Sequence, residues 1–220
     1  MHIKQFNRIS AIARWGVAIS FTMFLGLLLT GWIQHVNESP IWAAGIFVMV
    51  PIIQFLSTPL FTLLGIYTYY SPMVVSLGSN DRVINLHNGT SFDYLLEMRR
   101  VKPGLPWKKR MLVHYLAALQ QIIHMIETGK LPESVTVSGS SYFLSQRSAE
   151  RLGFTVSKTS FFKKLNIYFN YLDLLWAYSL TKGRLAFPNL RNIRTVSISG
   201  KELVTKKQKV TSLIERLVQA

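Results

Sequence analysis

Two uncharged stretches near the N-terminus decide the fold. Residues 15–34 read WGVAISFTMFLGLLLTGWIQ, and residues 41–69 read IWAAGIFVMVPIIQFLSTPLFTLLGIYTY. Each is long enough to cross a hydrocarbon core of about 30 Å as a helix. We therefore predict a transmembrane helical hairpin over residues 15–69. Pro51 and Pro59 each remove a helix hydrogen bond, so they predict bending of the second helix.

A secretory signal peptide and a buried soluble hairpin are the alternatives to a membrane hairpin. A signal peptide has a shorter apolar core that is followed by a cleavage site of small residues. The segment GWIQHVNESP contains no such site. A soluble helical hairpin rarely carries uncharged runs of this length. The pattern therefore favours two transmembrane spans.

Basic residues set the orientation that we expect for the hairpin. Lys4, Arg8 and Arg14 lie in the N-terminal segment 1–14, whereas the connecting loop HVNESP has only Glu38 as a charged residue besides its histidine. Lys and Arg are again frequent after the second span. By the positive-inside rule, both termini face the cytoplasm. We expect an integral protein of the bacterial inner membrane with a very short external turn.

Residues 70–220 are enough for one domain with its own core. They hold 22 of the 25 Lys and Arg residues and nine of the ten Asp and Glu residues, a net charge of +13. Anionic lipid headgroups, a nucleic acid or an anionic small molecule would each favour such a surface. No nucleic-acid-binding motif accompanies the charge. We therefore expect the lipid bilayer and its anionic lipids as partners, with a protein partner as an alternative.

The chain has no cysteine. Disulfides, cysteine nucleophiles and thiolate metal sites are therefore excluded. His114 and His124 share one predicted helix but are ten positions apart, which is not the spacing of a helical zinc pair. We predict no metal site.

Strand and helix patterns alternate after residue 70 and predict an α/β or α+β domain over residues 70–220. Asn88-Gly89 predicts a β-hairpin turn, and 92–98 is then a second strand or a short helix. The clearest helix covers 108–128, where apolar residues step by four and three. Further helices are predicted at 145–152, 161–180 and after a capping box at 199–202, and further strands within 70–77, 83–87, 135–137, 154–156 and 195–198.

His87 is the candidate for acid–base chemistry. It precedes Thr90, Ser91 and Asp93 at the end of a predicted strand. An Asp–His pair can hold a general base, because histidine titrates near neutral pH. The alternative is ordinary turn chemistry, since Asn, Gly, Thr, Ser and Asp are all common turn residues.

The run SGSSY is the candidate for anion binding. Gly139, Ser140 and Ser141 follow a predicted strand, and the predicted helix after them contains Arg147 and Arg151. Small residues let backbone N–H groups approach a phosphate, and arginines add charge-assisted hydrogen bonds. A plain strand-to-helix turn is the alternative.

The run SQRSAERLGFTVSK, residues 145–158, resembles the closing helix and strand of the GNAT acetyltransferase superfamily. With the preceding strand and the long helix, the resemblance covers about residues 108–158. It implies an acyl-CoA cofactor, Tyr142 near the thioester, and His87 or Asp93 as the acid or base.

The predicted helix 161–180 is unusually aromatic. We expect it either to pack in the core or to lie in the headgroup plane, where Lys163 and Lys164 would contact the membrane. Asp173 is its only acidic residue. This carboxylate either pairs with a neighbouring Lys or Arg or lies in a polar pocket.

Two functional classes follow from these features. The first is a non-enzymatic, membrane-anchored module that binds anionic headgroups or a protein partner at the inner leaflet. The second is a transferase, GNAT-like or otherwise, that uses an anionic, nucleotide-bearing donor. The sequence contains no complete catalytic motif.

Overall fold

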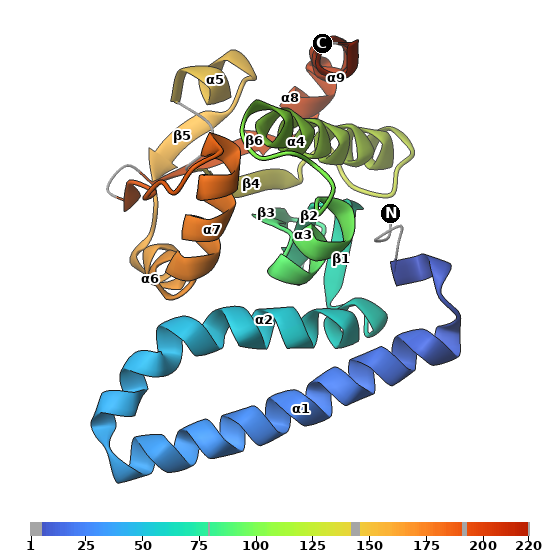
Figure 1. Ribbon diagram of the computed structural model, residues 1–220. Helices are drawn as coiled ribbons and strands as arrows, with labels where there is room; N and C mark the ends of the chain where they lie inside the picture. The colour runs from blue at the N-terminus through green and yellow to red at the C-terminus, as the bar shows by residue number, and fades with distance from the viewer. Residues whose placement is uncertain (1–5, 79, 142–145, 191–192, 220) are drawn as a thin grey trace.

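The computed structural model describes residues 6–78, 80–141, 146–190 and 193–219, and Figure 1 shows a helical hairpin beneath a mixed domain of helix and sheet. The hairpin consists of α1 (Ala11–Glu38) and α2 (Ile46–Leu63), joined by the 3₁₀ helix η2 (Pro40–Gly45). A short 3₁₀ turn, η1 (Phe6–Arg8), precedes it.

Both hairpin helices are long and apolar enough to cross a membrane. Hydroxyl groups inside them bond to their own helix, as when Thr30 Oγ1 donates to the Gly26 carbonyl at 2.9 Å. The second apolar helix ends earlier than we predicted. Gly65 has a φ of +70°, and the tyrosine-rich segment after it forms a strand, because it pairs with the next strand of the sheet.

The sheet has six strands in the order β1-β2-β3-β4-β6-β5. Neighbouring strands are antiparallel except β3 and β4, which are parallel because a long helix connects them. The six strands are β1 (Tyr67–Ser71), β2 (Val74–Leu77), β3 (Val83–Asn88), β4 (Thr136–Ser141), β5 (Thr155–Lys158) and β6 (Arg194–Ser199). The predictions at 83–87, 154–156 and 195–198 are confirmed with small shifts of their ends. The stretch 70–77 contains parts of two strands instead of one, and the strand predicted at 135–137 extends to Ser141.

The domain helices agree with the predicted positions but not always with the predicted lengths. They are α3 (Ser91–Glu97), α4 (Leu105–Glu127), α5 (Gln146–Arg151), α6 (Phe161–Phe169), α7 (Tyr171–Lys182), α8 (Gly200–Thr205) and α9 (Lys207–Gln219). The single helix predicted over 161–180 is wrong. It is interrupted at Asn170, whose side-chain amide donates to the Asn166 carbonyl at 2.7 Å.

The β-hairpin predicted at Asn88-Gly89 is also wrong. Gly89 N–H donates to the Met73 carbonyl at 2.9 Å, and Thr90 then begins α3 with a capping box. The local turn signal is overridden, because the capping box of α3 and the pairing of β3 with β2 use the same segment. The prediction of a short helix after the turn is confirmed.

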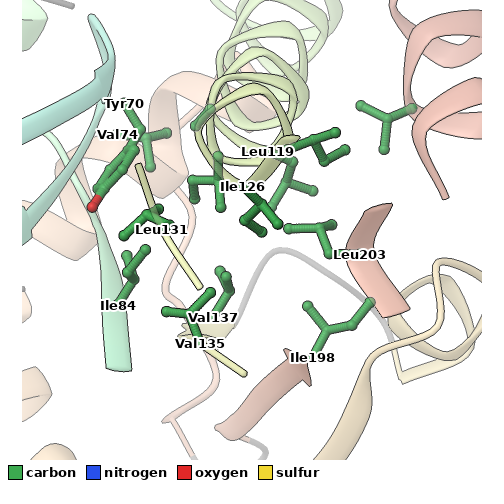
Figure 2. Packing of buried hydrophobic residues seen from close by; sticks show 14 of the residues in the cluster. Tyr70, Val74, Ile84, Leu119, Ile126, Leu131, Val135, Val137, Ile198 and Leu203 are labelled. Atoms are coloured by element: carbon green, nitrogen blue, oxygen red, sulfur yellow. The ribbon is translucent and has the colours of Figure 1, made fainter. Parts of the chain in front are cut away.

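The main core lies between one face of the sheet and α4, α8 and α9. Leu119 and Ile126 of α4 face Val137 of β4 and Ile198 of β6 (Figure 2). Gly200 starts α8 so close to the sheet that a Cβ would lie 2.9 Å from the Glu133 carbonyl. The glycine therefore sets how near α8 approaches the strands.

The hairpin runs along the domain rather than projecting from it (Figure 1). Helix α2 contacts α3, α6, α7 and β1. A second apolar cluster joins the N-terminus to the sheet and α3 through Phe6, Tyr69, Val75 and Phe92. The rings of Phe21 in α1 and Phe55 in α2 stack 6.0 Å apart against this cluster. The hairpin and the domain therefore share a core.

Candidate functional site

The sheet face opposite the main core is polar over β3, β4 and β6, although it is apolar over β1 and β2. Strands β3, β4 and β6 alternate apolar and polar residues, and cross-strand partners share a face. Asn85, Ser138 and Ser197 are such partners, and the Ser138 hydroxyl donates to Asn85 Oδ1 at 2.6 Å. His87 belongs to this face, two residues beyond Asn85. The fold thus presents polar side chains where α2, α6 and α7 cross the sheet.

A cavity of about 260 Å³ lies on this polar face. Its walls come from β1 to β4, α2, α3, α6 and α7, which lie between residues 54 and 177 of the chain. Polar residues of the lining include Gln54, His87, Ser91, Ser140, Asn166 and Asp173. We call it the polar cavity.

His87, the predicted acid or base, lines the polar cavity. The residue is exposed to solvent, but desolvation by the surrounding cavity walls lowers the pKa of its imidazole, and the nearby Lys163 ammonium lowers it further. The ring is therefore neutral at pH 7 and is able to accept a proton. Lys163 is half-buried and near enough to His87 to act on its charge, whereas Lys164 on the same helix is exposed. The two lysines that we predicted as a pair thus have different surroundings.

Asp93, predicted together with His87, lies elsewhere. Its side chain is 0% exposed and accepts hydrogen bonds from Thr90 N–H at 2.7 Å and Tyr69 Oη at 3.0 Å. Desolvation raises the pKa of Asp93 to about 7, although those hydrogen bonds oppose the shift. The carboxylate closes the capping box of α3. Asp93 therefore does not pair with His87 and does not orient its imidazole.

A hydroxyl pair connects α2 to this network. Thr58 Oγ1 lies 2.8 Å from Thr90 Oγ1, and Thr90 Oγ1 lies 3.3 Å from Asp93 Oδ2. Thr58 is completely buried. Sequence analysis missed its role, although a threonine beside Ser57 in an otherwise apolar helix was an available signal.

Asp173 lines the polar cavity and accepts a hydrogen bond from the Ser91 hydroxyl at 2.6 Å. Burial raises the pKa of its carboxyl group, and the Ser91 hydrogen bond lowers it. Of the two environments that we considered for Asp173, the polar pocket is confirmed. Neither ion pair found among the described residues involves it.

The predicted anion site is not an exposed turn. Gly139 and Ser140 lie inside β4, and Ser141 ends it. Their backbones pair with β6, and that of Gly139 also with β3, so they do not form a cradle of free N–H groups. Arg151 is exposed at the end of α5, where its carbonyl accepts from Lys209 Nζ. Tyr142 and the Arg147 side chain lie outside the described residues.

Within the described parts of the chain, no three His, Asp or Glu side chains gather as a metal site would require. The polar cavity instead offers a neutral imidazole, a hydrogen-bonded carboxyl group and several amides. Comparison of the chain with protein-family models, with curated proteins and with solved structures found no match.

Proposed function

We propose that this chain is an integral protein of the bacterial inner membrane, anchored by α1 and α2 and with both termini in the cytoplasm. Its domain is a non-enzymatic module that binds anionic lipid headgroups at the inner leaflet. The alternative is that the same surface binds a protein partner.

The exposed apolar surface of the hairpin supports insertion in lipid. Helix α1 packs on α2 along one side only, and large side chains cover its other sides. Such a surface is far larger than the scattered apolar residues of a soluble protein. Its exposed members in α1 are Ile12, Trp15, Ile19, Met23, Phe24, Leu27 and Ile33.

Helix α6 carries the proposal for headgroup binding. Phe161 is 71% exposed and Phe162 is 80% exposed, and the neighbouring Lys164 is exposed as well. The Phe169 ring lies 6.0 Å from the Phe47 ring of α2. An amphipathic helix with aromatic and basic residues, set beside a membrane helix, is suited to the bilayer interface.

The contact between Phe169 and Phe47 also bears on how the hairpin is oriented in the bilayer. Phe47 is near the turn end of α2, so an upright hairpin would bring Lys163 and Lys164 to hydrocarbon depth. A charged side chain there costs at least about 2.5 kcal/mol. We therefore place the hairpin along the cytoplasmic leaflet, with α1 deepest and α6 at headgroup level. The two crossings predicted from the sequence remain the alternative arrangement.

Site-specific labelling tests the headgroup contact, because the chain has no native cysteine. We would attach an environment-sensitive fluorophore to Leu165→Cys in nanodiscs of phosphatidylcholine with or without phosphatidylglycerol. We expect a bluer emission with phosphatidylglycerol, and a loss of that difference in Lys164→Gln. Lys201→Gln on α8, at the opposite side of the domain, is the matched control (Figure 1). If phosphatidylglycerol does not shift the emission maximum of the labelled protein with Lys164 intact, the proposal is contradicted.

A transferase is the second candidate, and one observation favours it. The neutral imidazole of His87 shares a cavity with the Ser91–Asp173 pair, which is an arrangement able to accept a proton from a substrate. The GNAT resemblance would make acyl-CoA the donor. Thermal unfolding with acetyl-CoA at one hundred times its dissociation constant should then gain about 2.7 kcal/mol. An unchanged transition with acetyl-CoA would exclude this donor.

A further inference from the structure

A second cavity, of about 430 Å³, lies between α2, α3, α7 and the start of α4. Its size is in the range of small-molecule sites. Most of its lining is apolar, and its main contributors are Phe55, Met98, Val101, Trp107, Trp176 and Leu180. We call it the apolar cavity. It meets the polar cavity at Ser91, Tyr94, Asp173 and Trp176, which line both.

The backbone holds one end of the apolar cavity in place. Gly104 N–H donates to the Leu180 carbonyl at 2.7 Å, which joins the start of α4 to the end of α7. A Cβ on Gly183 would lie 3.3 Å from the Gly104 Cα. Both glycines also have positive φ, so this close approach depends on them. The cavity is thus built into the fold rather than left between loose side chains.

Trp107 brings an unused donor to the apolar cavity. The residue is only 3% exposed, and its Nε1 is buried without a hydrogen-bond partner among the described residues. A buried indole N–H normally has a partner. The Trp107 ring stacks on the Tyr94 ring at 5.6 Å, and both residues line the cavity. A ligand oxygen would satisfy this donor.

Arg99 brings a positive charge to the same wall. It lines the apolar cavity, and neither ion pair found in the described parts of the chain involves it. A guanidinium group binds carboxylates with two parallel hydrogen bonds. The cavity therefore combines an apolar body, an unsatisfied N–H and a cation.

We propose that the apolar cavity binds a single-chain anionic amphiphile, a medium-chain fatty carboxylate. Its chain contacts Met98, Val101 and Trp176, and its carboxylate accepts from Arg99 and Trp107. Asp173 is the acidic residue of the lining. Its Oδ1 accepts from Ser91, so this carboxyl group belongs to the junction with the polar cavity. Phe55 of α2 lines the site, and ligand reaches it from the membrane that the hairpin contacts.

Fluorescence quenching by an ω-brominated medium-chain fatty carboxylate tests this site. In a Trp15→Phe, Trp32→Phe and Trp42→Phe background, only Trp107 and Trp176 remain as emitters, and both line the cavity. We would use the full chain in phosphatidylcholine nanodiscs. We expect saturable quenching that the unbrominated carboxylate reverses and that the corresponding methyl ester reverses poorly.

Three variants define the expected specificity. Arg99→Gln should weaken binding at least tenfold, because it removes the charge-assisted hydrogen bonds to the carboxylate. Its matched control, Arg100→Gln, is exposed and does not line the cavity, so it should leave the affinity unchanged. Val101→Phe should weaken quenching by narrowing the cavity. Its thermal transition, compared with that of the parent, shows whether the protein is still folded.

Quenching that rises linearly with the added carboxylate and is equal in all variants would mean partition into the bilayer, and it would overturn the proposal. Equal affinities of Arg99→Gln and Arg100→Gln would overturn the assigned head position and, with it, the choice of an anionic ligand. These outcomes do not depend on whether α6 responds to phosphatidylglycerol, so this proposal and the headgroup proposal fail separately.

Discussion

The fully buried carboxyl group of Asp93 makes the stability of the domain depend on pH. Its pKa of about 7 in the folded protein exceeds the value of about 4 expected in the unfolded chain. Between these values the folded state holds a proton that the unfolded state has lost. The free energy of unfolding therefore falls as pH rises from about 4 to about 7, by up to about 1.4 kcal/mol per pH unit. Above pH 7 this contribution levels off.

Asp93→Asn removes this titration. We expect the variant to lose the Asp93 share of the pH dependence, so that the difference in unfolding free energy between parent and variant changes steadily between pH 4 and pH 7. Denaturant unfolding across this range measures it. Parallel pH profiles would contradict the raised pKa, whatever the absolute stability of the variant.

The charge of Lys163 acts on His87. Desolvation by the surrounding cavity walls is the larger cause of the lowered His87 pKa, and the Lys163 ammonium adds to it. Lys163→Gln should therefore raise the His87 pKa but leave it below its ordinary value of about 6.5. NMR titration of the imidazole protons measures this. Lys164→Gln is the control, and an equal effect of both substitutions would contradict the separate environments of the two lysines.

At the scale of elements, one buried hydroxyl pair joins α2 to α3, beside the ring contact between Phe55 and Phe92. Thr58→Val removes the 2.8 Å contact with Thr90 and keeps the shape of the side chain. We expect a loss of about 1 kcal/mol in unfolding free energy, a typical value for one hydrogen bond. Thr30→Val is the control, because Thr30 bonds only within α1 and is exposed. Equal effects of the two substitutions would contradict the link.

The sequence predicts elements well where one periodicity dominates. Helix α4 was predictable because its apolar stripe packs into the main core, and α3 was one of two stated alternatives. Prediction failed where a tertiary partner decided the outcome. Residues 138–141 form a strand because they pair with β6, a partner that local turn propensities do not contain. The break within the predicted helix 161–180 has a local cause instead, since the Asn170 side chain bonds back to Asn166, four residues earlier.

The candidate sites were harder to predict than the elements, for the same reason. His87 could be singled out because its neighbours in sequence are polar. Asp173 could be noticed but not placed, since its partner Ser91 is 82 residues away. Trp107 resembles any core tryptophan until the cavity beside it is known. Cavities are made by elements that are distant in sequence, so their linings leave no local signal.

For the whole molecule, the shared core makes the hairpin part of the folding unit. Phe6 and Phe55 cover Phe92, and Tyr69 and Val75 belong to the same cluster. A fragment of residues 64–220 would expose this face. At about 1.5–3 kcal/mol for each large side chain, the loss approaches the total stability of an ordinary domain.

We therefore expect the 64–220 fragment to lack a cooperative thermal transition under conditions in which the full chain, in detergent or nanodiscs, unfolds cooperatively. Circular dichroism measures both. A fragment that melts at the temperature of the full chain would contradict a shared core and would make the hairpin a separable anchor.

The central claim is that the hairpin lies along the cytoplasmic leaflet and holds the domain against it. Labelling of Asn37→Cys with a membrane-impermeant maleimide tests this most directly, because Asn37 is exposed at the turn and the chain has no other cysteine. Gln208→Cys on α9 reports the cytoplasmic side. We predict that both sites are labelled in inverted membrane vesicles and that neither is labelled in intact spheroplasts. Labelling of Asn37→Cys from outside spheroplasts would contradict the account and establish two membrane crossings.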